Sequence, residues 1–464
     1  MYQGLPTPRR YLAIFAISFG IALVVIDGAI PSVALPTIAR SLGVDGASAV
    51  LVVTIYQLVL VMTLLPFAAL GDRIGHRRLY LLGLSVFTVA TILCFFARSL
   101  PFLLVVRAVQ SLGAAAALSV SSALLRAIYP ASHLGRGLGV NSVVVSSAQA
   151  AAPTLGGIVL AFGSWPWVFA VATPFAILSL LLGRSLPEPE RHSQDFDLLG
   201  AVLCAAMFGL LISGLESLVH GDSPVVSAAI VAVGILVGIV FVRRELGEKR
   251  PILPVDLLAR PVLALSTIGA FAAFIAAMTL ILSLPFRLER GFGFTPSEVG
   301  AMIAPWPLTT LFVAPTAGAL SDRIPAGLLG GIGMALATTA LLLLAFLPAD
   351  PDYFDIAWRM MLCGAGFGLF LSPNARLIIG SVPRERAASA GGMIATTRLT
   401  GQTVGATLVA ALLAFGLGGG PAPALIAAGL ALVAGLCSIA RLNPALRRPA
   451  LEEVSAHQPA AQLK

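Results

Sequence analysis

The sequence is poor in charged residues. Only 11% of its 464 residues are Asp, Glu, Lys or Arg, whereas a soluble chain usually carries about a quarter. Apolar runs of about 18 or more residues recur from end to end, and each is long enough to cross a bilayer. The composition therefore indicates a polytopic membrane protein rather than a soluble chain.

Residues that hold metals, nucleotides or disulfides are also scarce. The four cysteines lie within apolar runs without metal-ligand spacing, so we interpret them as small packing residues. The sequence has no G-x-x-x-x-G-K-[ST] phosphate loop and no His/Cys cluster. The net charge of +8 does not predict nucleic-acid binding, because the basic residues gather in certain loops. We expect no cofactor, no metal and no nucleic-acid partner.

Fourteen segments are long enough to span about 30 Å of hydrocarbon at about 1.5 Å per residue. Loops on one side of these segments hold 22 Lys and Arg residues and loops on the other hold 4. This bias predicts cytoplasmic N- and C-termini. The segments are 11–38, 48–70, 79–98, 101–125, 137–161, 165–186, 198–218, 224–242, 262–284, 298–320, 327–347, 355–380, 387–415 and 422–441.

An internal repeat relates the two halves of the chain. Residues 69–74 return as 319–324 with one difference, at an offset of 250 (319 − 69), and each copy lies between apolar runs. Parallel repeats are common in transporters. The segments within 198–242 have no counterpart, and removing them leaves six segments on each side. We predict an N-terminal six-helix bundle at 1–186, a linker with an extra helix pair at 187–260, a C-terminal six-helix bundle at 261–441 and a disordered cytoplasmic tail at 442–464.

Five motifs resemble those of the major facilitator superfamily, and the resemblance covers essentially the whole chain. The best match is its fourteen-helix drug:proton antiporter group (EmrB/QacA-like). The sequence departs from the usual motifs at Ala68, His76, Ala148 and Ala152, and Ala29–Ser32 replaces a usual Thr-Ile-Val-Asn core. The motifs lie at 26–38, 71–77, 107–114, 152–157 and 398–405.

The resemblance implies an all-α membrane protein with two six-helix bundles and a central helix pair. It implies a proton-coupled secondary transporter, not an enzyme, that exports lipophilic or cationic drugs by alternating-access antiport. A transporter of a metabolite or nutrient is the alternative. The expected partners are a small-molecule substrate, protons and membrane lipid. The expected location is the bacterial inner membrane, as a monomer. The sequence shows no second cluster of polar residues and no sizeable soluble domain, and this argues against a membrane enzyme or a sensor.

Asp27 is an acidic residue well inside a predicted span. A carboxylate at membrane depth costs at least about 2.5 kcal/mol, so it must be paired, hydrated or protonated. A carboxyl group that can be either charged or neutral suits a proton carrier. In its charged form it could also bind a cationic drug. Arg107 is its natural counter-charge, because a buried guanidinium needs an acceptor. The alternatives are a structural acid and an Arg that binds backbone carbonyls.

The loop at 71–78 is predicted to act as a conformational latch. Asp72 can accept from backbone N–H groups at a helix end or pair with an Arg of a nearby helix. The second copy lacks a glycine where the first has Gly75, so we expect it to be the weaker latch. The charges could equally serve only to set topology. The predicted latch residues are Gly71, Asp72, Arg73, Gly75, Arg77, Asp322 and Arg323.

Further candidates are weaker. Ala152, Gly156 and Gly157 form a small-residue stripe with Ala148, and Pro153 of the same antiporter motif can bend the helix. The stripe suits either a moving interface or tight static packing. Arg359 could be solvated at a helix end, and Glu216 is expected at the membrane interface. A last group could line a cavity or serve as structural hydrogen-bonding residues: Gln57, Asn141, Gln149, Trp306, Asn374, Arg398 and Gln402.

Overall fold

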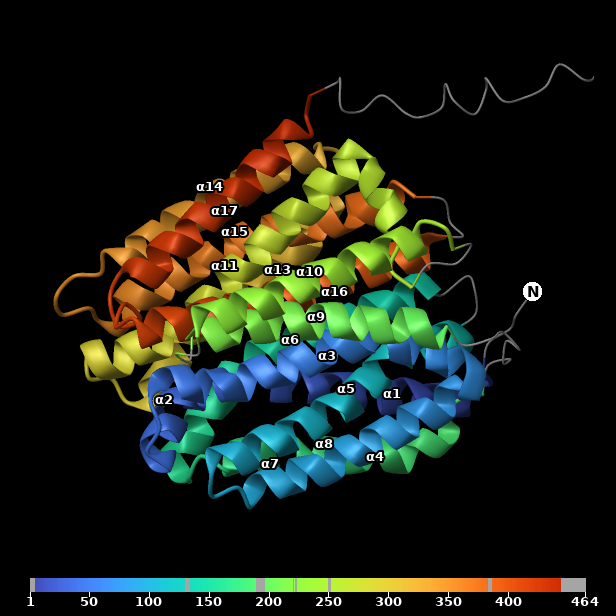
Figure 1. The fold of residues 1–464 in the computed structure, drawn as a ribbon, viewed down its shortest axis with the longest axis horizontal. Helices are drawn as coiled ribbons and strands as arrows, with labels where there is room; N and C mark the ends of the chain where they lie inside the picture. Colours follow the sequence, from blue (N-terminus) through green and yellow to red (C-terminus); the bar gives the residue numbers. More distant parts are fainter. Residues whose placement is uncertain are drawn as a thin grey trace, which may run out of the picture.

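The computed structural model describes residues 5–129, 134–188, 197–219, 221, 223–248, 252–382 and 386–443, and its regular structure there is helical throughout (Figure 1). The first helices are α1 (Thr7–Ala29), α2 (Pro31–Leu42), α3 (Gly46–Ile74), α4 (His76–Phe95), α5 (Leu100–Ile128), α6 (Leu134–Phe162), α7 (Trp167–Ala170) and α8 (Thr173–Leu182), followed by the 3₁₀ turn η2 (Gly183–Ser185). The rest are α9 (Leu198–Val219), α10 (Pro224–Glu245), η3 (Val255–Ala259), α11 (Pro261–Gly291), α12 (Pro296–Ile303), α13 (Pro305–Leu320), α14 (Ala326–Ala345), α15 (Tyr353–Gly380), α16 (Ala387–Ala414) and α17 (Ala422–Ala440).

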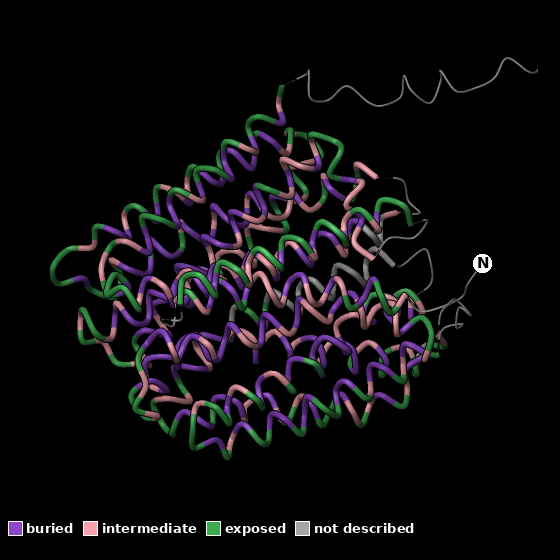
Figure 2. Tube along the Cα trace, viewed as in Figure 1, coloured by how far each residue is buried: buried purple, intermediate pink, exposed green. Residues whose placement is uncertain are grey.

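Twelve helical segments within the described residues are long and apolar enough to cross a membrane. Helices α6 and α16 occupy the other two stretches where the sequence predicts spans, so the number fourteen stays a prediction. Buried residues line the helix faces that meet inside the bundle, and exposed residues lie on the outward faces (Figure 2). Because many exposed side chains are large and apolar, the outward surface suits contact with lipid.

Three predicted single helices are interrupted in the structure. The segment predicted at 11–38 is two helices that meet at Ile30, and the one predicted at 298–320 divides at Ala304. In both places the next residue is a proline, Pro31 or Pro305, which has no N–H to continue the helical ladder. The segment predicted at 165–186 consists of α7, α8 and η2. The predicted boundaries of these three helices were therefore wrong, although the prediction that each stretch is helical was right.

The helices form two groups that follow the chain order. Helices α1 to α8 lie mainly in one part of the molecule and α11 to α17 in the other (Figure 1). The α9–α10 hairpin lies alongside, with α9 packed against α3 of the first group and α16 of the second. Helices α3 and α16 also pack directly on each other. The interface between the groups is thus built from α3, α9 and α16 together with α2, α6, α11, α12 and α13.

Both groups contain the same close helix crossing. Helices α4 and α5 approach so closely that a Cβ on Gly83 would lie 2.7 Å from the carbonyl oxygen of Gly113. In the second group, a Cβ on Gly333 of α14 would lie 2.6 Å from the carbonyl oxygen of Gly366 of α15. The offsets are 250 (333 − 83) and 253 (366 − 113). The repeat in the sequence is therefore also a repeat in the packing, and any side chain at these glycines would push the helices apart.

Candidate functional site

Asp27 of α1 and Arg107 of α5 form an ion pair in the interior of the first group. Arg107 Nη1 donates to Asp27 Oδ2 at 2.6 Å, and the two side chains are 0% and 1% exposed. The guanidinium also donates through Nε to the carbonyl oxygen of Val52 on α3, at 3.3 Å. A buried ion pair must have its remaining donors and acceptors satisfied to offset desolvation. Neighbouring side chains supply several of these hydrogen bonds.

Gln110 completes the pair and was not singled out from the sequence. It lies three residues after Arg107, on the same face of α5, where residues at this spacing are neighbours. Its Oε1 accepts from Arg107 Nη1 at 2.6 Å, and its Nε2 donates to Asp27 Oδ1 at 3.0 Å and to Thr91 Oγ1 at 2.8 Å. Both carboxylate oxygens of Asp27 therefore have a donor. The spacing to Arg107 was the signal that could have identified Gln110.

The Tyr56 ring packs against the guanidinium of Arg107. The guanidinium carbon lies 4.2 Å from the ring centroid of Tyr56 and 5.3 Å from that of Phe169. Such cation–π contacts stabilise a desolvated cation. Tyr56 is 1% exposed, and its hydroxyl has no hydrogen-bond partner among the described residues. Tyr56 also lines a cavity.

A cavity of about 90 Å³ lies between the two groups, and both contribute to its walls. Asp27 is not among its lining residues, although the adjacent Gly28 and the intervening Tyr56 are. The predicted ion pair thus lies one residue behind the cavity wall. The lining residues are Val24, Val25, Gly28, Ala29, Ser32, Tyr56, Gln57, Leu60, Leu118, Gln149, Met278, Ile281, Arg398, Leu399 and Gln402.

The polar part of this cavity contains four of the seven residues predicted to line one. Gln57, Gln149, Arg398 and Gln402 come from α3, α6 and α16 and face the same space. Gln57 is 6% exposed, and its Oε1 has no partner among the described residues. The cavity therefore offers amide groups, a hydroxyl and one guanidinium to a small molecule.

The other three predicted cavity residues do not line it. Trp306 is buried, with its ring centroid 5.1 Å from that of Phe367. Asn374 donates to the carbonyl oxygen of Ser266 at 3.1 Å and accepts from Arg441, so it is a structural hydrogen-bonding residue. The side chain of Asn141 lies outside the described residues.

Arg359 and Glu216 both have polar partners. Arg359 Nη1 donates to Asp355 Oδ1 at 2.8 Å, one helical turn earlier on α15. Glu216 of α9 is 8% exposed and accepts from the Thr407 hydroxyl of α16 at 2.6 Å. Glu216 lies near the end of α9, as predicted, but its side chain is buried against α16. The sequence could not show it, because the contact joins residues 191 positions apart.

The first copy of the repeated loop makes local contacts. Asp72 Oδ1 lies 3.0 Å from His76 Nε2, and Arg77 donates to the carbonyl oxygen of Arg184 at 3.2 Å. Gly75 has a φ of 105°, which a side chain would strain, and joins α3 to α4. Gly71 is close to Val120, where a Cβ would lie 2.5 Å from Cγ1. These contacts hold α3 and α4 against neighbouring helices.

The second copy joins two helices through an ion pair. Arg376 of α15 binds Asp322 through Nη2, and its Nη1 donates to the carbonyl oxygen of Gly318 at 2.7 Å. The equivalent of Arg376 in the first half is Arg126 (376 − 250), which is exposed. The expectation of a weaker second latch stays a prediction, although the second copy carries a side-chain ion pair to a neighbouring helix. Arg73 and Arg323 are exposed.

The small residues of α6 lie against the second group. A Cβ on Gly300 of α12 would lie 2.7 Å from the carbonyl oxygen of Pro153 and 3.0 Å from the Cα of Gly157. Ala152 is fully buried, and Gly156 faces Ile30 between α1 and α2. The backbones of α6 and α12 are thus in direct contact.

An ion pair crosses the interface at the same end of the bundle. Arg40 of α2 lies 2.7 Å from Glu289 of α11. Together with the α6–α12 crossing, this contact seals the two groups at the end where α2, α6 and α11 finish.

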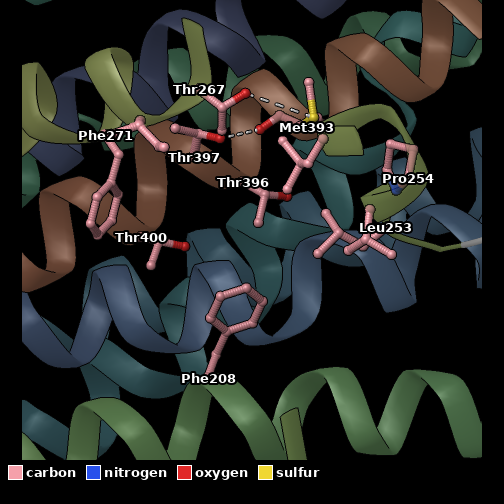
Figure 3. A pocket seen from close by; sticks show the side chains of 12 residues that line it. Phe208, Leu253, Pro254, Thr267, Phe271, Met393, Thr396, Thr397 and Thr400 are labelled. Atoms are coloured by element: carbon pink, nitrogen blue, oxygen red, sulfur yellow. Dashed lines mark hydrogen bonds between the residues drawn. The ribbon is translucent and has the colours of Figure 1, made fainter. Parts of the chain in front are cut away.

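A second cavity, of about 280 Å³, lies on the opposite face of α16 (Figure 3). Met393, Thr396, Thr397 and Thr400 line it from α16, while residues 398, 399 and 402 face the central cavity. Its other walls come from Phe208 of α9, from α11 and from residues 253–258. Its lining is almost wholly apolar, so it suits hydrocarbon. Helix α16 is the partition between the two cavities.

Comparisons with known proteins agree with this architecture. The family model described as Major Facilitator Superfamily matches residues 17–406 and 266–464. The solved structure of a bacterial homolog to the human lysosomal transporter Spinster, inward-facing and occupied, superimposes with a TM-score of 0.69 over 94% of this chain and 98% of that one, at 16% identity.

Three relatives cover most of the chain. An uncharacterized transporter of Escherichia coli (strain K12), YebQ, is 45% identical over 95% of this chain and 97% of its own. The riboflavin transporter RibZ of Clostridioides difficile (strain 630) is 28% identical over 84% and 85%. The multidrug resistance protein Stp of Mycobacterium tuberculosis (strain CDC 1551 / Oshkosh) is 30% identical over 87% and 76%. The chain is a multi-pass membrane transporter that belongs to the Major Facilitator Superfamily.

Proposed function

We propose that the chain is a proton-coupled secondary transporter that exports small amphiphilic compounds by alternating-access antiport. The observation that carries this proposal is the buried Asp27–Arg107 pair, one aromatic ring away from a cavity between two helix groups. A carboxyl group in this position can gain or lose a proton at low electrostatic cost only if its partner rearranges. Such a rearrangement is what links protonation to conformation.

Tyr56 is the proposed link between the pair and the substrate. When Asp27 takes up a proton, its attraction for Arg107 weakens, and the guanidinium is free to shift against the Tyr56 ring. Because Tyr56 also lines the cavity, such a shift changes the space available to a substrate. The coupling then works through the cavity wall and does not require a direct contact between Asp27 and the substrate.

The scaffold for this movement is the predicted fourteen-span arrangement, with α9 and α10 as the additional pair and both termini in the cytoplasm. In that orientation the sealed end, with Gly157, Gly300 and the Arg40–Glu289 pair, faces outward. Opening outward requires the α6–α12 crossing to separate. The Asp322–Arg376 pair and the loop at Asp72 lie at the other end and are the proposed inner latches.

The relatives support export. Stp bears the name of a multidrug resistance protein, and a methyl viologen resistance protein, SmvA, also matches the chain. The apolar cavity beside α16 supports a lipophilic substrate.

A metabolite transporter is the second candidate. The described lining of the central cavity includes amides and a guanidinium but no carboxylate, and this favours it, as does the similarity to RibZ.

A susceptibility panel tests the proposal. A pump-deficient bacterial host expresses the wild type, Asp27→Asn, or the control Asp350→Asn, in which an exposed loop carboxylate is changed. Wild type and the control should raise resistance to some of a set of dyes, quaternary amines and antibiotics, and Asp27→Asn should not. If the wild type changes no susceptibility, export of toxicants is excluded. If Asp27→Asn protects as well as the wild type, proton coupling at Asp27 is excluded.

A further inference from the structure

We propose that Arg398 binds the anionic group of a small organic substrate, such as a carboxylate, in the central cavity. This inference rests on the proposed transport function and specifies its substrate class. It differs from the expectation of cationic substrates, because Arg398, a cation, is the one charged side chain among the described residues that line the central cavity.

Arg398 lies near the middle of a long helix. It is 11 residues from the start of α16 (398 − 387) and 16 from its end (414 − 398), which places it about 17 Å along the helix axis. A charged side chain at such depth in a membrane is costly unless it faces a counter-charge or water. The cavity is the space that it faces.

Asp27 and Glu216 are both engaged by other side chains. Asp27 lies behind Tyr56, with both oxygens bound by Arg107 and Gln110. Glu216 binds Thr407, nine residues further along α16 (407 − 398), or about 14 Å away along the helix. No hydrogen bond or ion pair joins Arg398 to another side chain in the described part of the chain. Its guanidinium therefore presents five donors and a full positive charge to whatever enters the cavity.

Other groups around the cavity suit the remainder of such a substrate. Gln57 Oε1 and the Tyr56 hydroxyl are buried without partners among the described residues. Buried polar groups usually have a hydrogen-bond partner, so unpaired ones next to a cavity indicate a ligand or water. The other walls are mostly aliphatic, including Met278 and Ile281. A cavity of about 90 Å³ can hold the anionic group of the substrate and part of a ring. The rest of the substrate can enter only when the two helix groups separate.

Equilibrium binding of two dyes of the same ring system tests the charge preference. The purified full-length transporter in detergent is titrated against fluorescein, which carries a carboxylate, and against rhodamine 6G, a cationic ester, by fluorescence anisotropy. The variants are Arg398→Gln, Arg398→Lys and the control Arg243→Gln, in which an exposed arginine of α10 is changed. The assay needs no proton gradient, so its result is independent of the Asp27 proposal.

The wild type should bind fluorescein at least tenfold more tightly than Arg398→Gln, because a charge-assisted contact is lost. Arg398→Lys should restore part of the difference, and Arg243→Gln should match the wild type. Rhodamine 6G should bind Arg398→Gln as well as, or better than, the wild type. The inference is overturned if fluorescein does not bind the wild type, if Arg398→Gln binds it equally well, or if both dyes weaken in parallel.

Discussion

Removing either member of the Asp27–Arg107 pair should destabilise the protein strongly, and the two removals should differ in their pH dependence. Breaking a buried ion pair by removing one partner typically costs about 3–5 kcal/mol. Arg107→Met keeps an unbranched apolar stem but removes the ion pair, the bonds to Gln110 and to the Val52 carbonyl, and the cation–π contact with Tyr56. We therefore expect a loss of about 4 kcal/mol in the free energy of unfolding.

Proton uptake distinguishes the two single variants. In Arg107→Met the stranded carboxyl group of Asp27 can bind a proton, and the folded state then holds more protons than the unfolded state. Stability should therefore rise as the pH falls, by up to about 1.4 kcal/mol per pH unit. In Asp27→Asn the stranded guanidinium cannot lose its proton, so its cost should not change with pH. The double variant removes both charges and should recover at least about 2 kcal/mol relative to the sum of the single losses.

Reversible unfolding in mixed micelles, at about pH 8 and about pH 6, measures these quantities. Arg243→Met, which changes an exposed arginine, is the control and should remain within about 0.5 kcal/mol of the wild type. The reasoning is refuted if the two single losses add within about 0.5 kcal/mol in the double variant. It is also refuted if Arg107→Met and Asp27→Asn respond to pH in the same way.

Three further predictions follow from other contacts. Gly300→Leu should lower transport at least tenfold without loss of expression. Even the Cβ of the new side chain would lie 2.7 Å from a carbonyl oxygen of α6, so the sealed end could not close. Normal transport by this variant would show that the α6–α12 crossing is dispensable. Arg376→Gln removes the ion pair with Asp322, and both side chains of this pair are about half exposed. The effect on the equilibrium between conformations should therefore not exceed about 1 kcal/mol, or about fivefold in transport rate. A complete loss of transport would contradict this prediction. The hydrogen bond from Arg386 lowers the pKa of Asp256. The stability lost in Asp256→Asn, at most about 1 kcal/mol, should therefore be constant above about pH 5 and vanish as the pH falls below about 4. A difference in stability between the wild type and Asp256→Asn that grows at acid pH would contradict this prediction.

Hydropathy and the internal repeat predicted most of the helices, because every span must present an apolar surface to lipid. The divisions at Pro31 and Pro305 were missed because membrane helices often tolerate proline. The sequence shows the residue that can break a helix, but it does not show whether neighbouring helices will compensate. The repeated crossings at Gly83 and Gly333 were missed because the chain contains 46 glycines, and only packing shows which ones allow two backbones to meet.

The candidate site was predictable to the extent that membrane burial makes charge costly. Asp27 and Arg107 were recognised as charges within spans, and the structure pairs them. The barrier formed by Tyr56 could not be predicted, because an aromatic residue in an apolar segment resembles any other packing residue. Arg398 was predicted as a possible cavity residue and lines the cavity, whereas the sequence could not show that Asp27 would not line it.

The most direct test of proton coupling compares two modes of transport in inverted membrane vesicles. One is accumulation driven by an imposed pH gradient, and the other is exchange of labelled for unlabelled substrate, which requires no net proton movement. The substrate is a compound to which the transporter confers resistance. With Asp27→Asn, gradient-driven accumulation should be lost while exchange continues near the wild-type rate. Accumulation that still follows the pH gradient in this variant would contradict the central claim.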